Sequence, residues 1–289
     1  MIYLSSFCFP DRNAEVDFFW SQKQTCYNSF YPFQVLSEKE IERLELSHIT
    51  VLYGGNGSGK TTALNIIAET LKVQRDAAYN RSSFFEAYTE LCGYELNTSI
   101  PDNSRIITSD DVFDYILNIR SLNGSIDKKR EELFEEYTEA KYAGFKLKSI
   151  DDYDRLKQIN AARRNTQSRY VSKNLMKNVR ERSNGENAYI YFFDRIKEDG
   201  LYLLDEPENS LSPKRQLELL ELIEDCAGYL GCQFIIASHS PFLLAAKGAK
   251  IYDLDETPVT EKKWTELSHV KMYYEFFKKH ENDFDTDSL

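Results

Sequence analysis

The pattern of apolar and polar positions divides the chain into three parts. The first and last thirds show strand and helix patterns in alternation, and the middle, about 73–185, shows mainly helix patterns. Residues 48–55 are β-branched and apolar and then break at two glycines, which predicts a buried strand entering a loop. The next stretch, 60–71, is apolar at positions 63, 64, 67, 68 and 71, the spacing of an amphipathic helix. The last third returns to this alternation: we predict strands at 201–206, 233–239 and 249–256, with helices at 212–230 and 241–248.

The N-terminal part is less regular. Residues 2–9 alternate weakly and predict a strand that Pro10 ends, and 31–36 predicts a second strand. Residues 13–30 are rich in aromatic side chains without a clean period, so we expect irregular or strand-like structure there. The polar stretch 37–46 is expected to form a short helix or a turn.

The middle of the chain, about 73–185, is polar and charged, and its pattern predicts helices at 110–122, 127–143 and 151–181. Strand–helix units therefore flank a helical insertion. We predict an α/β fold with parallel strands and an inserted helical lobe.

Composition and cysteine usage bound the class of protein. Apolar residues make up 42% of the 289 positions, enough for a sizeable core. The longest apolar runs stay below eighteen residues and the N-terminus lacks a basic region, so we expect neither a membrane span nor a signal peptide. The five cysteines form no CxxC pair or Cys/His cluster, which disfavours zinc and favours a reducing cytoplasm.

The net charge of −11 disfavours general binding to nucleic acids or membranes, but the charge is unevenly distributed. From Arg155 to Arg182 there are nine Lys or Arg residues and one acidic residue. This segment is either a solvated helical face or a surface for nucleic acid or an acidic partner.

The sequence GGNGSGKT at 54–61 matches the pattern GxxxxGK[ST] of a phosphate-binding loop. The predicted strand before it and the helix after it supply the context that this motif needs, against the alternative of a glycine-rich turn with a chance lysine. Backbone N–H groups and the helix N-terminus would hold phosphate, Lys60 would bridge phosphates, and Thr61 would offer a hydroxyl to Mg²⁺. The candidate ATP-binding residues are Gly54, Gly55, Asn56, Gly57, Ser58, Gly59, Lys60, Thr61 and Thr62.

Two further polar groups follow predicted strands. Asp205 and Glu206 end the strand at 201–206, where Asp205 is placed to hold the metal and Glu206 to activate the attacking water. His239 ends the next strand, where it would contact the γ-phosphate. Helix capping is the alternative for the carboxylates, and a structural turn histidine is the alternative for His239.

A small polar turn, Ser183-Asn184-Gly185-Glu186, follows the basic segment. Taken alone it predicts a helix start, with Ser183 as N-cap and Glu186 as its capping-box partner.

The order of these motifs resembles an ABC-type ATPase: the phosphate loop, a helical insertion, RSNGE, LYLLDEPENSLSP and IIASHS. The chain is similar to the small soluble AAA-family ATPases near the SMC and RecF-like DNA-repair proteins, over about 30–289. This resemblance implies a P-loop NTPase of the ABC-ATPase type with a mixed, mainly parallel sheet and antiparallel N-terminal strands. It also implies a single head at 1–289, with the helical lobe inserted at about 73–198.

The resemblance also implies the roles of the turn and of the chain as a whole. Ser183, Asn184, Gly185 and Glu186 would form the signature that contacts the γ-phosphate bound to a second protomer. The cofactors would be ATP and Mg²⁺, and the active form would be an ATP-gated homodimer.

Some positions depart from the family pattern. Asp110 stands where a metal-sensing Gln or Glu is expected, and a role as N-cap of the following helix is an equal alternative. Ser212 replaces an expected Asp. Tyr31 or Phe33 would stack on adenine, although packing in the core is the favoured alternative.

We therefore expect a cytoplasmic, Mg²⁺-dependent ATP hydrolase that acts in nucleic-acid processing or antiviral defence, beside an effector such as a nuclease. An ATP-dependent binding switch with little turnover is the first alternative. The ATPase subunit of a transporter is the second, and a phosphate-loop kinase is the least favoured.

Overall fold

A computed structural model of the chain describes residues 1–23, 26–41, 43–144, 153–179 and 182–284. The chain divides into two compact units, each described by itself. Unit 1 comprises Met1–Phe113 and Asn184–Leu289, and unit 2 comprises Asp114–Ser183.

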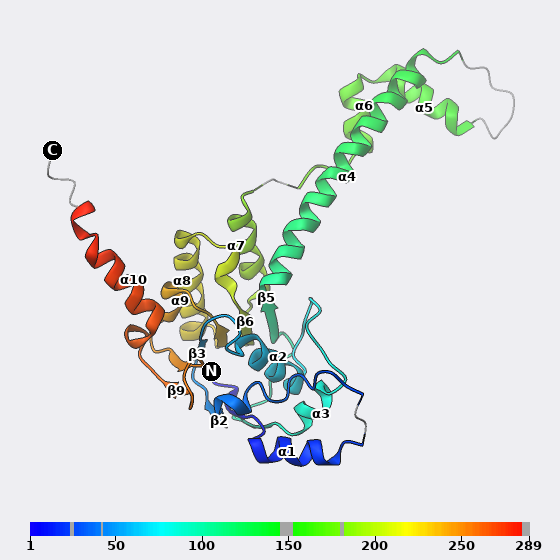
Figure 1. Cartoon of the computed structure of the whole chain (residues 1–289). Helices are drawn as coiled ribbons and strands as arrows, with labels where there is room; N and C mark the ends of the chain where they lie inside the picture. The colour runs from blue at the N-terminus through cyan, green and yellow to red at the C-terminus, as the bar shows by residue number, and fades with distance from the viewer. Residues whose placement is uncertain (24–25, 42, 145–152, 180–181, 285–289) are drawn as a thin grey trace. The chain divides into compact units, whose positions relative to one another are not determined.

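The centre of unit 1 is a six-stranded sheet (Figure 1). Its strands follow in the order β5 (Arg105–Thr108), β6 (Leu201–Asp205), β7 (Gln233–Ala237), β3 (Ile49–Tyr53), β8 (Lys250–Asp253) and β9 (Thr260–Glu261). The first five are parallel, and β9 is antiparallel to β8. All residues of β3, β6 and β7 are buried, which is why the sequences of these strands are mainly apolar. The four strands predicted at 48–55, 201–206, 233–239 and 249–256 are confirmed.

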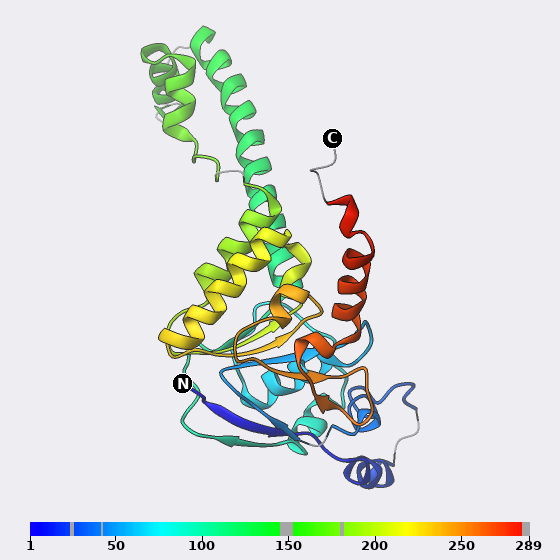
Figure 2. The same ribbon diagram turned by 90° about the vertical axis from the view of Figure 1, so that its left-hand side faces the viewer.

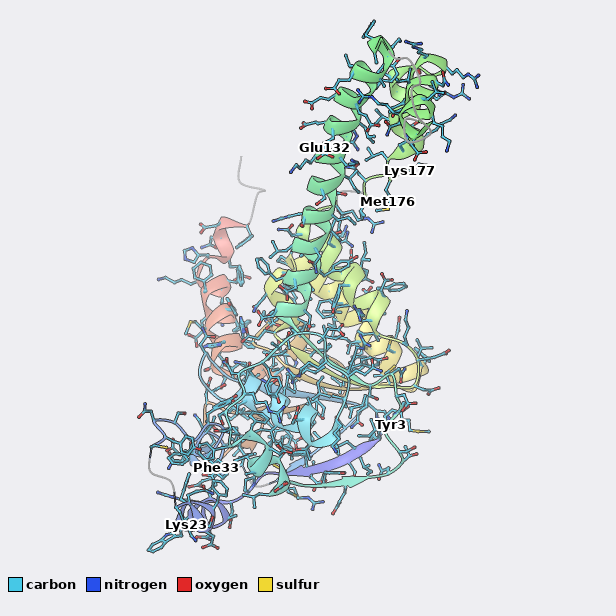
Figure 3. The ribbon with its side chains drawn as sticks, turned by 90° about the vertical axis from the view of Figure 1, so that its right-hand side faces the viewer. Tyr3, Lys23, Phe33, Glu132, Met176 and Lys177 are labelled. Carbon is cyan, nitrogen blue, oxygen red and sulfur yellow. The ribbon has the colours of Figure 1, made fainter. Side chains whose placement is uncertain are left out.

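A second sheet in unit 1 has three antiparallel strands in the order β2 (Arg43–Glu45), β1 (Leu4–Cys8) and β4 (Gly93–Leu96). The strand predicted at 2–9 is therefore confirmed as β1, and Figure 3 labels Tyr3 just before it. The fully buried Gln233 of β7 joins the two sheets, since its amide accepts from Tyr3 N at 2.9 Å and donates to Leu4 O at 2.8 Å. The predicted fold class, α/β with a mixed sheet and antiparallel N-terminal strands, is confirmed.

Helices complete unit 1 (Figure 2). They are α1 (Arg12–Ser21), α2 (Lys60–Leu71), α3 (Phe85–Glu90), the start of α4 (Ser109–Tyr142), α7 (Asn184–Arg195), α8 (Pro213–Tyr229), α9 (Pro241–Leu244) and α10 (Ser268–Lys279). The helices predicted at 60–71, 212–230 and 241–248 are confirmed as α2, α8 and the shorter α9. The central residues of α2 are almost wholly buried in the main core.

Two predictions for the N-terminal part are wrong in part or in full. The aromatic stretch at 13–30 is helical up to Ser21, in α1, which Asp11 caps by accepting a hydrogen bond from Ala14 N at 2.7 Å. The predicted irregular structure is confirmed at 22–23 and 26–30, and 24–25 lie outside the described residues. The strand predicted at 31–36 is a turn, because Gln34 adopts a left-handed φ of 68° that no strand accommodates. Within this turn lies Phe33, which Figure 3 labels. Its side chain is buried and stacks on Phe18 with the ring centroids 4.3 Å apart. The stretch 37–46 contains a short helix, η1 (Ser37–Lys39), and also strand β2, which the pattern did not predict.

Unit 2 consists of the rest of α4 with α5 (Tyr153–Arg164) and α6 (Gln167–Asn174). Its small core includes Leu133, Tyr137, Ile159 and Tyr170. The two helices predicted at 110–122 and 127–143 form one continuous helix through Gly124. The single helix predicted at 151–181 is wrong, since α5 and α6 are separate; its residues 151–152 and 180–181 lie outside the described residues. The predicted single head with a lobe at about 73–198 stays a prediction.

Candidate active site

The phosphate loop joins the end of β3 to the start of α2. Gly57 and Gly59 adopt φ values of 81° and 98°, in the left-handed region that favours glycine. At Gly54 an added Cβ would lie 2.4 Å from Ser58 Oγ, so no larger residue fits there. These constraints explain why three positions of the motif are glycine. Because they lack a side chain, the backbone of 54–59 can turn tightly into the helix.

Lys60 is the first residue of α2, and its side chain is only 4% exposed. Its ammonium donates to Gly54 O at 2.8 Å and Gly55 O at 2.9 Å, and it lies 3.7 Å from Glu206 Oε1. Its charge is therefore fixed inside the curve of the loop. This position suits a cation that neutralises phosphate.

Thr61 and Asp205, the two predicted metal ligands, lie together. Thr61 Oγ1 donates to Asp205 Oδ1 at 3.0 Å. Burial raises the pKa of Asp205 to about 6, although the bond from Thr61 and the Lys60 ammonium oppose the shift. A divalent cation beside this carboxylate would favour its ionised form.

The oxygen ligands fit Mg²⁺, which keeps several waters and is usually held by one or two protein oxygens together with substrate phosphates. Within the described part of the chain, no group of three or more His, Cys, Asp or Glu side chains could hold a metal by itself. A metal at Thr61 and Asp205 would therefore depend on phosphate oxygens.

Glu206 follows β6 directly and adopts a left-handed φ of 46°, which is uncommon outside glycine. Its backbone N–H donates to Ala237 O at 2.9 Å, while its Oε2 accepts from Asn209 Nδ2 at 2.8 Å. The turn directs the partly exposed carboxylate toward Lys60 instead of back into the sheet. Such strained backbone is often found at functional sites.

His239 follows β7, and its side chain is 40% exposed. The loop that carries it is held by Glu208, a buried carboxylate that the sequence analysis missed. Glu208 Oε1 accepts from Ser238 Oγ at 2.8 Å and from the backbone N–H groups of His239 and Ser240 at 2.9 and 3.2 Å. Since His239 Nδ1 lies only 3.4 Å from the same oxygen, Glu208 positions both the loop and the ring.

A second missed carboxylate, Asp255, fastens the phosphate loop. Its two oxygens lie 2.9 and 3.0 Å from Gly55 N, and its own N–H donates to Asp253 Oδ1 at 3.0 Å. Asp253 is buried and forms an ion pair with Lys262 at 3.0 Å. The end of β8 is thereby bonded to the first turn of the phosphate loop. The local signal in the sequence is the acidic pair at 255–256, which follows β8 after Leu254.

Asp110 lies in the first turn of α4, where it lines a cavity of about 440 Å³ together with Thr61 and Asp205. Asp111, the next residue, makes the local bonds at this helix start: its Oδ2 accepts from Thr108 N at 2.7 Å and from Thr108 Oγ1 at 2.8 Å. Tyr31 also lines the cavity and donates to Thr62 Oγ1 at 3.2 Å. The metal-sensing role of Asp110 and adenine stacking by Tyr31 stay predictions.

The predicted signature falls at the start of α7, which begins at Asn184. Gly185 approaches the loop that follows Glu206, since an added Cβ would lie 3.6 Å from Ser210 O. Glu186 Oε1 lies 3.5 Å from Arg215 Nη2 on α8. Ser183 precedes the helix by one residue and is the last residue of unit 2. Ser212, at the predicted Asp position, is the N-cap of α8.

Comparison with known proteins identifies the family. The family model described as "ABC transporter" matches residues 42–209, from before β3 through the phosphate loop, β6 and Glu206. This match spans more than half of the chain. The chain belongs to the ABC transporter family. It is an ABC-type ATPase domain that binds ATP, and the predicted family resemblance is confirmed.

A second family model, described as "AAA domain, putative AbiEii toxin, Type IV TA system", matches residues 187–245. This match runs from α7 to the end of α9 and contains Asp205, Glu206 and His239. No curated protein sequence matches the ABC-type ATPase.

Solved structures similar to this ABC-type ATPase share little sequence with it. An Smc head domain from Pyrococcus furiosus, bound to the C-terminal domain of ScpA, is 14% identical, with a TM-score of 0.39 and coverage of 81% of this chain and 94% of that one. A metal-chelate type ABC transporter in an inward-facing conformation is 19% identical, with a TM-score of 0.37 and coverage of 80% and 79%. None of the helices in the described ranges combines the length and apolar content that crossing a bilayer requires.

The site of the ABC-type ATPase thus gathers a buried ammonium, an oxygen pair suited to a metal, a partly exposed carboxylate and a histidine at the carboxyl ends of adjacent parallel strands. Ligands of open α/β sheets bind at this edge. The arrangement can hold a triphosphate and place a base beside its terminal phosphate.

Proposed function

We propose that this ABC-type ATPase hydrolyses ATP with Mg²⁺ as an ATP-gated homodimer. The single observation that carries the proposal is the placement of Lys60, Asp205, Glu206 and His239 at one edge of the six-stranded sheet. Members of this family generally hydrolyse nucleotides, and their domains generally dimerise head-to-head.

In the proposed reaction, Lys60 and the backbone of the phosphate loop hold the phosphates. Mg²⁺, held by Thr61 and Asp205, would supply positive charge to the phosphate oxygens. Glu206 takes a proton from a water molecule while the oxygen of that water forms a bond to the γ-phosphorus. The bond between the γ-phosphorus and the ADP oxygen breaks at the same time. His239 hydrogen-bonds the γ-phosphate and keeps the water in line.

The second protomer closes the site in this proposal. Ser183 would offer its hydroxyl, and the N-terminus of α7 its N–H groups and dipole, to the γ-phosphate bound by the other subunit. Two such sites across a two-fold axis make a symmetric sandwich. Loss of the γ-phosphate removes the bridge, and the heads separate.

Two measurements test this proposal. Wild-type ATPase activity should exceed that of Glu206→Gln by roughly 100-fold or more, as general-base catalysis contributes. Glu206→Gln should elute as a dimer with ATP and Mg²⁺ and as a monomer without them. Equal rates for both proteins would favour a binding switch, and a monomer under both conditions would overturn the sandwich.

The basic surface of unit 2 supports nucleic acid as a partner, and we propose that the ATP cycle controls this binding. On α5, α6 and the residues after them the cations Arg155, Arg164, Arg169, Lys173 and Lys177 are exposed. Within the described ranges, none of these five forms a salt bridge with a carboxylate. If four phosphates are neutralised, the slope of log K against log salt is roughly −3.6. A flat salt response, or no binding by the ATP-locked dimer, contradicts this role.

The match of 187–245 to a model that names a toxin system favours a role in antiviral defence beside an effector such as a nuclease. The test is protection of cells from phage by the gene with its neighbours. Lys60→Ala should abolish protection if ATP binding drives it. A permease gene next door would instead favour service in a transporter.

A further inference from the structure

Helix α10 exposes an unusual amount of apolar surface. All nine residues from Lys271 to Lys279 are exposed, and only Val270 near its start is buried. Five large side chains are between 50% and 66% exposed: Met272, Tyr273, Tyr274, Phe276 and Phe277. In Figures 1 and 2 the helix stands apart from the sheet and from the other helices of unit 1. A helix with this surface needs a partner to bury it.

The first residues of α10 lie near the carboxyl end of β3, at the edge of the sheet that carries the candidate active site. Ser268 Oγ lies 3.0 Å from Tyr53 OH, and His269 N donates to the same hydroxyl at 3.2 Å. Tyr53 is the last residue of β3 and directly precedes the phosphate loop. The helix therefore begins beside the edge at which Lys60 and Asp205 meet.

The charge of α10 is opposite to that of the chain. It carries Lys271, Lys278 and Lys279 against a single acidic residue, Glu275, while the whole chain has a net charge of −11. A second copy of this acidic chain is thus a partner of complementary charge. Complementary charge guides association and fixes orientation.

The area of this surface distinguishes a supplementary contact from an independent dimer. Large aromatic side chains bury about 150–250 Å² each, so the four aromatic side chains together with Met272 offer on the order of 500 Å² at these exposures. A stable interface of standard size needs about 800 Å² per partner. Pairing through α10 alone is too small, but it would substantially enlarge a dimer that ATP already holds together.

From these observations we propose that α10 packs against the second copy in the ATP-bound dimer. The partner protomer buries the stripe that contains Met272, Tyr273 and Phe276, and the contact is made only when the heads close. This proposal rests on the proposed function, since the occupant is the second head of the ATP sandwich. It adds an apolar arm, beside the nucleotides, to the interface.

The test uses the full-length chain in the Glu206→Gln background, with the dimerisation constant measured by analytical ultracentrifugation with and without ATP and Mg²⁺. Phe276→Glu should weaken ATP-driven dimerisation by roughly 30-fold, the loss typical of an interface hot spot. Tyr229→Glu is the matched control: Tyr229 is 85% exposed at the end of α8, near the start of β7 and thus at the opposite edge of the sheet. Its dimerisation constant should match that of the parent.

The outcomes separate the two proposals. Equal dimerisation by Phe276→Glu and the parent overturns the α10 contact and leaves the ATP sandwich intact. A parent that never dimerises overturns both proposals. Hydrogen exchange gives a second readout: amides 271–279 should be protected in the ATP-bound dimer, and unchanged exchange there also overturns the contact. Because the Phe276 side chain is exposed, its replacement should leave the melting temperature of the monomer unchanged.

Discussion

Asp255 offers a sharp test of how the phosphate loop is held. Its carboxylate is bonded to Gly55 N at 2.9 and 3.0 Å, and Asp255→Ala removes this fastening while leaving the loop sequence intact. If the bond keeps the loop ordered, the variant must order the loop when ATP binds. A hydrogen bond of this kind contributes about 1 kcal/mol at an exposed position, so the Kd for ATP should rise roughly fivefold.

Charge acts in the opposite direction and needs its own control. A carboxylate near the phosphates repels them, so removal of its charge alone should tighten binding. Asp255→Asn removes the charge but keeps an oxygen that can accept from Gly55 N, so its Kd should stay at or below the wild-type value. Glu256→Ala removes the same charge one residue away, where Glu256 forms an ion pair with Lys262 at 2.6 Å and not with the loop.

The assay is a titration of each variant with a non-hydrolysable ATP analogue and Mg²⁺, followed by calorimetry. Fastening predicts that Asp255→Ala alone weakens binding. Asp255→Asn has lost the same charge but keeps the acceptor, so it is the reference for this comparison. If Asp255→Ala binds ATP as tightly as Asp255→Asn does, then Asp255 does not order the loop and the reasoning fails.

Three further changes probe other parts of the site. Ser183→Arg should abolish ATP-driven dimerisation and hydrolysis while monomer ATP binding persists; loss of monomer binding would identify Ser183 as a structural residue. With EDTA and no nucleotide, Asp205→Asn should stabilise the protein by about 2–3 kcal/mol at pH 7.5, since burial raises the carboxyl pKa to about 6 and penalises the charged form. This gain in stability should shrink as the pH falls from 6 toward 4, because Asp205 binds its proton at a higher pH in the native state than in the unfolded state. Thermal melts that show an equal gain at pH 7.5 and pH 4.5 would refute this. Glu208→Ala should lower both kcat and the melting temperature with little change in KM, because three donors around His239 lose their acceptor, and Glu208→Gln should recover part of both; an unchanged kcat would contradict a positioning role.

The phosphate loop and the strands around it were predictable because their signals are local. Glycines that alone fit the turn, an apolar run and a 3.6-residue period all fall within 48–71, and the structure places them as β3, the loop and α2. Lys60, Asp205 and Glu206 could be brought together without knowledge of packing, because the carboxyl ends of parallel strands meet at one edge.

The parts that could not be predicted depend on contacts distant in sequence. Helix α1 has aromatic side chains on more than one face, and its buried Glu15 accepts a hydrogen bond through Oε2 from Ser37 Oγ at 2.7 Å, a partner that no periodicity reveals. The acceptor role of Glu208 requires the loop at 238–240 beside it. Asp255 acts on a loop that precedes it by most of the chain, so its role became visible only in the folded protein.

The order of strands in the central sheet also governs how this chain can be made. β3 pairs on one side with β7 and on the other with β8, so that Ile49 lies opposite Phe234 and Thr50 opposite Lys250. Synthesis from the N-terminus therefore exposes a mainly apolar strand whose two edges have no native neighbour until nearly the whole chain has emerged. Unpaired strand edges of this kind pair readily with other chains, so aggregation of the nascent chain is a hazard until β7 and β8 are made. A polypeptide truncated before β7 would contain the phosphate loop but lack the neighbouring strands that hold it.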